Sequence, residues 1–221
     1  MTYQVAEQFL SINGEGPRAG QLAYFVRFQG CNLACSYCDT RWACGPNCPT
    51  KELSAQEIAW AAGKSGADSV TLTGGEPLLR LGMGELLDVL AEEAGLPVEI
   101  ETNGSVDLSP YAGLSHRPSF TMDYKLPGSG MEGRMCRSNF QLLTAEDVVK
   151  FVCASREDLE RGGEIAAEFS LAGRVPLYFS PVFGQLDPIE IVEFMKELRL
   201  PGARLQLQLH KFIWPPEQRG V

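Results

Sequence analysis

Three cysteines in one short segment place the strongest constraint on how this chain can fold. They form the pattern Cys31-x3-Cys35-x2-Cys38, directly after residues 22–28 (LAYFVRF), whose aromatic and β-branched side chains predict a strand. Clustered thiolates are typical ligands of soft metals and iron–sulfur clusters. Three ligands are one fewer than a closed zinc site or an electron-transfer cluster normally has. One coordination position is therefore left for a group that is not protein.

Composition indicates in which compartment the protein is expected and which classes of partner are disfavoured. The chain has 221 residues, is 44% hydrophobic and 21% charged, and carries a formal net charge of −9. These values predict a single globular domain and argue against a nucleic-acid partner or an anionic membrane. No apolar run reaches membrane-spanning length, and residues 1–10 (MTYQVAEQFL) do not resemble a signal peptide. We therefore expect a cytoplasmic protein, in which cysteines serve metal binding or catalysis rather than disulfides.

The rest of the chain alternates between strand patterns and helix patterns. We predict further strands at 69–73, 98–101, 120–124, 148–153, 175–180 and 205–210, and helices at 54–64, 83–94, 156–170 (interrupted by Gly162-Gly163) and from Asp187-Pro188 onward. This order predicts an α/β fold with about six to seven parallel strands and helices outside the sheet. A closed eightfold barrel usually needs about 250 residues, so an incomplete TIM-like β/α barrel fits better.

Polar residues follow several of these strands, at the edge of the sheet where α/β proteins bind ligands. Thr73-Gly74-Gly75-Glu76-Pro77 follows one strand, Glu101-Thr102-Asn103 ends the next, and Asp123-Tyr124-Lys125 ends the one after it. Two glycines at the end of a strand let a ligand approach the backbone closely. Because the cysteine loop lies at the same edge, the sequence predicts a site that combines a metal centre with a backbone cradle for a ligand.

Two charged residues near the start of the chain are open to two interpretations each. Arg27 lies within an apolar strand, so it either faces solvent or pairs with an anionic ligand. Glu15 lies in the turn at 12–17, where it is either solvated or part of a clamp for a ligand.

Two further pairs of residues are also open to two interpretations each. The alternation in LQLQLH (205–210) places Gln208 and His210 on one face of a strand, which is either a solvated edge or the wall of a polar cavity. Cys44 and Cys48 are either free thiols in a loop or the start of a second metal site.

The cysteine motif and the Thr73–Pro77 turn together resemble the radical S-adenosylmethionine (SAM) superfamily. The resemblance implies a [4Fe–4S] cluster held by Cys31, Cys35 and Cys38, whose fourth iron binds the amino and carboxylate groups of SAM. It also implies an external one-electron reductant, such as a flavodoxin-like protein, and release of a 5′-deoxyadenosyl radical on reduction. The cosubstrate would fill the coordination position that the cysteines leave open, and the protein would orient it and exclude water.

Further residues spread along the chain are similar to those of the 7-carboxy-7-deazaguanine synthase family of the queuosine and deazapurine pathway. They are Phe9, Gly14-Glu15-Gly16, Phe25-Val26-Arg27, Gly30-Cys31, Cys38-Asp39-Thr40, Ile100-Glu101-Thr102-Asn103-Gly104, Asp123-Tyr124-Lys125, His210-Lys211 and Arg219-Gly220-Val221. This resemblance implies a carbon–nitrogen lyase that converts 6-carboxy-5,6,7,8-tetrahydropterin to 7-carboxy-7-deazaguanine with loss of ammonia. It implies catalytic use of SAM, a requirement for Mg²⁺, and a homodimer. It also implies one domain, 1–221, whose short C-terminal tail closes the active site.

The same resemblance assigns roles to individual positions. The pterin would contact Ile12, Asn13, Gly14, Glu15, Arg27, Thr73, Gln208, His210 and Val221. SAM would contact Tyr37, Asp39, Gly74, Gly75, Glu76, Glu101, Asn103, Asp123, Tyr124 and Lys125. Thr40 would offer its hydroxyl to Mg²⁺, a hard cation that prefers oxygen ligands. No side chain is expected to act as a catalytic residue, because the SAM-derived radical carries the chemistry.

Two alternatives use the same motif differently. A glycyl-radical-enzyme activase shares the cysteine spacing and a compact partial barrel, but Arg27 and Thr40 favour a small anionic substrate over a protein backbone. A non-catalytic iron–sulfur or zinc module would need a fourth protein ligand, for which Cys44 is available, but would not need the glycine turn.

Overall fold

A nine-stranded mixed sheet forms the frame of the molecule. The computed structural model describes residues 1–221, and its strands follow the order β3-β1-β2-β4-β5-β6-β7-β8-β9. The strands are β1 (Thr2–Ile12), β2 (Leu22–Phe28), β3 (Lys51–Ser54), β4 (Ser69–Gly74), β5 (Val98–Thr102), β6 (Ser119–Tyr124), β7 (Val148–Cys153), β8 (Leu177–Pro181) and β9 (Ala203–Leu205). From β2 through β9 all neighbours in this order are parallel, whereas β1 and β3 are antiparallel additions at one edge. Because β3 and β9 do not pair, the predicted incomplete barrel of six to seven parallel strands is confirmed.

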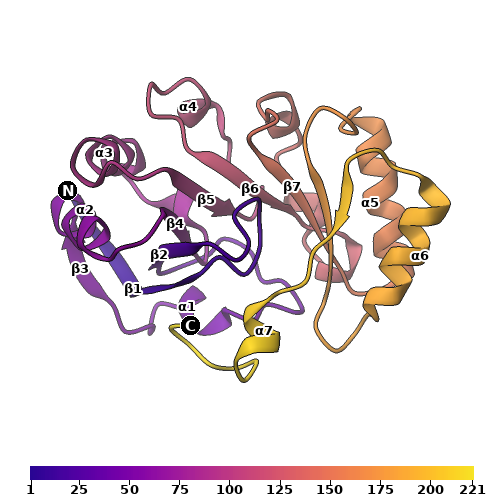
Figure 1. The fold of residues 1–221 in the computed structure, drawn as a ribbon, viewed down its shortest axis with the longest axis horizontal. Helices are drawn as coiled ribbons and strands as arrows, with labels where there is room; N and C mark the ends of the chain where they lie inside the picture. The colour runs from indigo at the N-terminus through magenta and orange to yellow at the C-terminus, as the bar shows by residue number, and fades with distance from the viewer.

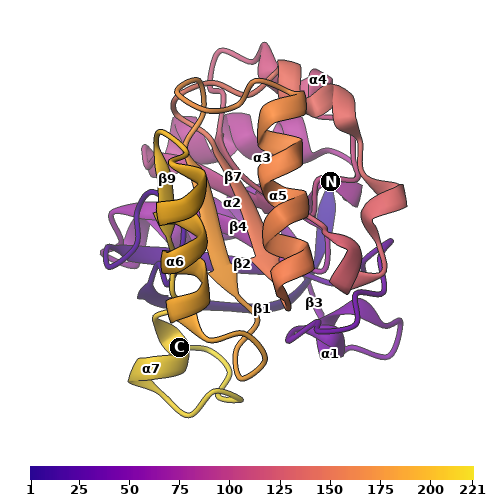
Figure 2. The same ribbon diagram turned by 90° about the vertical axis from the view of Figure 1, so that its right-hand side faces the viewer.

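The helices cover the outside of this sheet. They are α1 (Arg41–Cys44), α2 (Ala55–Lys64), α3 (Met83–Val89), α4 (Ser109–Ala112), α5 (Arg156–Glu168), α6 (Pro188–Leu198) and α7 (His210–Ile213). Figure 1 shows α2 and α3 towards one end of the sheet and α5 and α6 towards the other. In Figure 2, α5 and α6 stand in front of the strands, and α7 lies at the same end of the molecule as α1. No helix is both long enough and apolar enough to cross a membrane.

Sequence signals placed most of these elements correctly. The helix predicted at 54–64 is α2, and it begins with a capping box in which Ser54 Oγ accepts from the Glu57 N–H while the Glu57 carboxylate accepts from the Ser54 N–H. The helix predicted at 83–94 is α3 followed by a π-helical turn, η2 (Leu90–Ala94), which ends at Gly95 in the left-handed region.

Three predictions about the elements were wrong. We predicted no strand before residue 22, but residues 2–12 form β1 and pair with strands on both sides. Gly162 and Gly163 do not interrupt α5; they let it pack closely, since a Cβ on Gly162 would lie 3.0 Å from the Phe179 ring. The strand expected at 205–210 ends at Leu205: the Gln206 N–H still donates to the Phe179 carbonyl of β8, while its side chain accepts from the Gly16 N–H.

The two faces of the sheet have opposite chemistry. The outer face and the helices enclose an apolar core that includes Leu72, Ile100 and Phe151. The inner face carries polar side chains at alternate positions, among them Thr73, Glu101, Asp123 and Lys150, which line a cavity. This alternation follows from the two-residue period of a strand and gives the barrel a polar interior.

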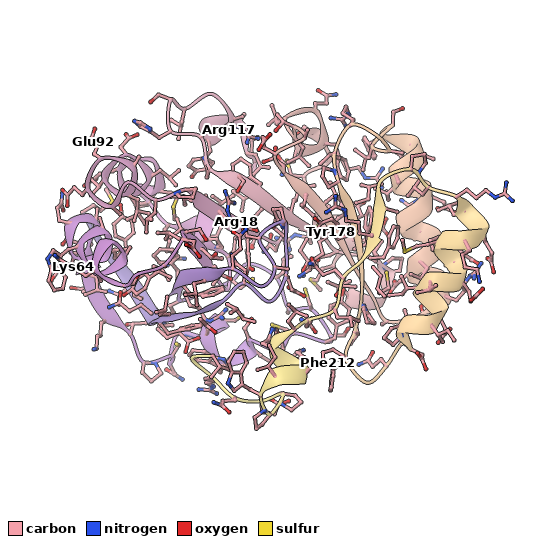
Figure 3. All side chains as sticks on the ribbon, in the orientation of Figure 1. Arg18, Lys64, Glu92, Arg117, Tyr178 and Phe212 are labelled. Carbon is pink, nitrogen blue, oxygen red and sulfur yellow. The ribbon has the colours of Figure 1, made fainter.

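Glu99 is a buried acid on the inner face of β5, outside this cavity, and it should make stability depend on pH. Its Oε1 accepts from Thr121 Oγ1 at 2.5 Å, and its Oε2, which has no hydrogen-bond partner, lies 3.9 Å from Arg18 Nη1. Figure 3 shows Arg18 reaching across the strands from the β1–β2 loop. Burial raises the pKa of Glu99 to about 7, with Thr121 and Arg18 opposing the effect. The native state therefore favours the protonated form, whose stabilising contribution is complete below the ordinary pKa and lost as the pH rises through about 7.

We expect Glu99→Gln to raise the free energy of unfolding at pH 8 by about 3 kcal/mol relative to the native chain and by little at pH 5. Urea unfolding at both pH values measures this difference. Glu92→Gln, on the exposed side of η2, is the matched control and should change neither value. A gain for Glu99→Gln that is equal at pH 5 and pH 8 would contradict the prediction.

Candidate active site

One cavity of about 440 Å³ collects residues from across the chain. The cysteine loop, the glycine turn after β4 and the ends of β5 and β6 form one wall. The start of the β1–β2 loop, α7 and the C-terminal tail form the opposite side. The cavity therefore lies at the carboxyl edge of the parallel strands, where the sequence predicts the site.

The glycine turn and the cysteine loop are held together by backbone contacts. The Gly75 N–H donates to the Phe28 carbonyl at 3.1 Å, and the Glu76 N–H donates to the Gly30 carbonyl at 2.9 Å. A Cβ added to Gly75 would lie 2.2 Å from the Gly30 oxygen and 2.9 Å from Cys31 Cβ. Only glycine allows this approach, so the turn fixes the cysteine loop as well as lining the cavity.

The three motif cysteines line this cavity as free thiols. Cys31 Sγ accepts from the Leu33 N–H at 3.4 Å and from Asn103 Nδ2 at 3.6 Å, while Cys38 Sγ lies 3.8 Å from Thr40 Oγ1. The neighbouring Cys44 thiol, which retains its proton, is the main cause that lowers the pKa of Cys31 and of Cys38. Two of the three motif thiols therefore lose their protons more readily than a free cysteine does.

This donor set fits an iron–sulfur cluster. No three His, Cys, Asp or Glu side chains converge closely enough to hold a single metal ion. Three thiols that share a cavity without meeting at one point suit the corners of a larger cluster. Cys44 also lines the cavity, whereas Cys48 is buried and donates to the Pro49 carbonyl. The two therefore do not form a second metal site of their own.

Glu76 has a structural position that its motif does not predict. Its carboxylate is fully buried and accepts from the Leu78 N–H, the Asn103 N–H and the Thr102 hydroxyl. Burial raises its pKa to about 7, although these hydrogen bonds oppose the effect. Its oxygens are used within the protein, so Glu76 ties the glycine turn to the end of β5 instead of facing the cavity.

Ion pairs line the interior of the cavity. Arg27 Nε donates to Glu7 Oε1 at 2.8 Å, next to a bulge in β1. Lys125 Nζ lies 2.6 Å from Asp123 Oδ2. Pairing stabilises these charged groups in a site that is largely shielded from water. The cations can bind an anionic ligand there, and the carboxylates can accept a ligand's hydrogen bonds.

The C-terminal tail lines one side of the cavity. Lys211 Nζ in α7 lies 3.1 Å from Asp39 Oδ2, next to the cysteine loop. The Arg219 guanidinium stacks on Trp42 of α1, 4.1 Å from the ring centroid, and Val221 lines the cavity. These contacts place the last residues of the chain beside the residues that follow the cysteine motif.

The structure brings most of the predicted site residues to this cavity. They are Ile12, Gly14, Glu15, Arg27, Cys31, Cys35, Tyr37, Cys38, Asp39, Thr40, Thr73, Gly74, Gly75, Glu101, Asn103, Asp123, Lys125, Gln208, His210 and Val221. Arg27 therefore faces the cavity and not solvent, and Glu15 is not solvated.

Three predicted residues do not reach the cavity: Asn13, Glu76 and Tyr124. The side-chain oxygen of Asn13 accepts from Thr71 Oγ1 at 2.9 Å, and Tyr124 packs in the outer core against Phe140 and Phe151. Sequence reasoning missed Lys150 and Trp42, which do line it. The signal for Lys150 was a single charge within the apolar strand VVKFVC, the same signal that drew attention to Arg27.

A three-thiol loop and a glycine turn at the carboxyl edge of an incomplete β/α barrel define a radical SAM enzyme. The family model described as "Radical SAM superfamily" matches residues 25–114, which include both motifs. Enzymes of this class use a [4Fe–4S] cluster and SAM, and require a reductant.

Relatives along the whole chain identify the branch of this class. The 7-carboxy-7-deazaguanine synthase of Clostridium acetobutylicum is 50% identical over 221 residues, covering 100% of both chains. That of Chlorobaculum tepidum is 38% identical and covers 98% of this chain and 96% of its own. The crystal structure of QueE from Escherichia coli has the same fold, with a TM-score of 0.73 at 22% identity over 93% of this chain and 94% of that one. The chain belongs to the 7-carboxy-7-deazaguanine synthase family, as the sequence predicts.

Proposed function

We propose that this enzyme converts 6-carboxy-5,6,7,8-tetrahydropterin to 7-carboxy-7-deazaguanine. Loss of one ammonia balances the atoms, so the overall reaction needs no net oxidant. SAM bound at the reduced cluster supplies hydrogen-atom abstraction from C6 and the later return of that hydrogen. The protein's own residues bind and orient the two ligands and exclude water from the cavity.

Arg27 in the cavity is the observation that carries the substrate assignment. Its Nε donates to Glu7 Oε1 at 2.8 Å, and its side chain lines the cavity. A guanidinium held in this way can pair with a carboxylate through its remaining N–H groups, and the pterin has one carboxylate. Thr73 Oγ1 donates to Glu101 Oε2 at 2.7 Å, which fixes both side chains next to Arg27 on the neighbouring strand.

The cosubstrate is assigned to the wall next to the thiols. Gly74 and Gly75 line the cavity next to the thiols, where their backbone groups can bind the amino-acid part of SAM. Asn103 and the Asp123–Lys125 pair provide hydrogen-bonding groups on the adjoining strand ends. Glu76 supports this wall indirectly, through the Asn103 N–H.

Product formation tests the proposal. The cluster is reconstituted without oxygen, and reductant, SAM, Mg²⁺ and 6-carboxytetrahydropterin are added. Mass spectrometry should detect 7-carboxy-7-deazaguanine and one ammonia per product. Cleavage of SAM without this product would overturn the substrate assignment and leave the radical SAM class intact.

Thr40 should govern the response to Mg²⁺. Its hydroxyl lies at the cavity wall, two residues after Cys38, and can offer a hard oxygen ligand. We expect Thr40→Ala to lower the Mg²⁺-dependent rate at least about tenfold, while Thr40→Ser retains it. Rates measured across a Mg²⁺ titration give the comparison. An unchanged Mg²⁺ response in Thr40→Ala would exclude this role.

The setting proposed for the enzyme is the cytoplasm, with a flavodoxin-like electron donor and a homodimeric assembly. Light scattering of the purified protein tests the assembly, and a monomeric mass would exclude it.

A further inference from the structure

Lys150 on β7 is a buried cation that lies between the two halves of the cavity. Its side chain is 9% exposed, and Nζ donates to Glu15 Oε2 at 2.5 Å and lies 4.0 Å from Asp123 Oδ2. Glu15 belongs to the β1–β2 loop, which Figure 1 shows passing close to β6 and β7, and Asp123 belongs to the end of β6. One ammonium therefore joins two carboxylates that come from distant parts of the chain.

Electrostatics keep this ammonium charged. Burial alone would lower the pKa of Lys150, but the carboxylates of Glu15, Asp123 and Glu101 outweigh burial and raise it. A buried cation is costly unless it is paired, so the ion pairs with Glu15 and Asp123 hold Lys150 in place. In return, Lys150 orients Glu15 directly and acts on Asp123 together with Lys125, which pairs with the same Asp123 oxygen.

Each of these carboxylates keeps one oxygen without a partner. Glu15 Oε1 and Asp123 Oδ1 are both buried and accept no hydrogen bond. Unpaired buried oxygens are rare in proteins, and both residues line the cavity. Ligand N–H and O–H groups are the donors that can reach them: those of the pterin for Glu15 and those of SAM for Asp123.

We infer that Lys150 is a positioning residue that couples the pterin and SAM subsites. This inference rests on the proposed function. Lys150 holds Glu15 Oε2 directly and shares Asp123 Oδ2 with Lys125, whose Nζ lies 2.6 Å from it, so the opposite oxygen of each carboxylate is left for a different ligand. A ligand that fixes one carboxylate thereby fixes the ammonium and the second carboxylate. Each ligand should then tighten the binding of the other by the same factor, as linkage requires.

Binding measurements without turnover test this coupling. Equilibrium dialysis of the reconstituted, unreduced holoenzyme gives the Kd of SAM with and without 6-carboxytetrahydropterin. We expect the pterin to lower the Kd of SAM at least about fivefold in the native chain. In Lys150→Met it should leave the Kd of SAM unchanged. The reciprocal experiment, pterin binding with and without SAM, should give the same factors.

Two further variants keep the result interpretable. Lys196→Met on α6, whose Nζ pairs with Glu193 at the surface, is a matched control and should keep the native factor. Glu15→Gln/Lys150→Met removes the pair without leaving an unpaired buried carboxylate at Glu15, so it serves if Lys150→Met unfolds. It should also show no coupling.

The outcomes separate the inference from the proposed function. If the native chain binds SAM but no pterin, the proposed function fails and the inference fails with it. If the native chain binds both ligands without coupling, or if the variants weaken both and keep the native factor, the coupling role is overturned while the proposed function stands. A lysine that only supports the fold would give that last result.

Discussion

Arg27→Gln is expected to lower kcat/KM for 6-carboxytetrahydropterin by about 100- to 1,000-fold, with most of the loss in KM. The guanidinium is 15% exposed and is held at Nε by Glu7, so its remaining N–H groups are fixed towards the cavity. In a site shielded from water, two parallel charge-assisted hydrogen bonds to a carboxylate are worth far more than at the surface. Glutamine retains a donor but neither the charge nor the fork geometry. Steady-state kinetics with the reconstituted enzyme measure the effect.

The substrate carboxylate provides the sharpest control for Arg27. A tetrahydropterin that lacks the carboxyl group should bind native enzyme and Arg27→Gln equally weakly, because the lost interaction is absent in both. Arg27→Lys should recover part of the affinity through charge alone, and Arg134→Gln on the exposed turn η4 (Glu132–Arg134) should match the native enzyme. If Arg27→Gln weakens binding of both pterins by the same factor, Arg27 supports the cavity but does not bind the carboxylate.

Local sequence chemistry predicted the parallel part of the fold well. The β-branched run at 148–153 is β7, and the Ser54/Glu57 pair is the start of α2. Both signals are complete within a few residues, so no distant part of the chain is needed to interpret them. The cysteine loop belongs to the same class, because its three ligands lie within eight residues of one another.

The parts that sequence reasoning missed depend on contacts between distant residues. β1 contains Glu7 and Gln8 in its interior, which weakens its strand pattern; Glu7 is tolerated because it meets Arg27 across the β1–β2 pair. The pattern at 205–210 alternates as a strand should, but Gln206 finds the Gly16 backbone 190 positions away. In both cases the decisive partner could not be identified from the local residues.

The same distinction applies to the candidate site. A motif located Glu76 next to the ligand cradle, but it could not show that Thr102 and Asn103 already use the carboxylate. Lys150 and Arg27 carry the same sequence signal, a cation inside an apolar strand. Only the sheet register shows that both face inward, where Lys150 meets Glu15.

Gly75→Ala is expected to impair retention of the cluster. The added Cβ would lie 2.2 Å from the Gly30 oxygen, so the turn after β4 and the cysteine loop would have to separate. The two atoms nearest to the added Cβ, the carbonyl oxygen and carbon of Gly30, belong to the backbone and cannot rotate away. They are also tied to adjacent strands, where Phe28 pairs with Gly74 and the Gly75 N–H donates to the Phe28 carbonyl. Overpacking of this kind costs about 1–3 kcal/mol of stability.

The separation would fall on the loop that carries all three thiols, so iron content should respond more strongly than overall stability. We expect Gly75→Ala to hold less than about half of the native iron after anaerobic reconstitution, and to unfold at lower urea concentration. Gly84→Ala in α3 is the matched control, because its Cβ meets no atom within 4 Å and alanine favours a helix by up to about 1 kcal/mol. If Gly75→Ala bound iron and unfolded as Gly84→Ala does, the turn would not be what holds the cysteine loop in position. Since Gly75 lies between the thiols and the proposed SAM site, such a result would also remove the steric reason for glycine at this position.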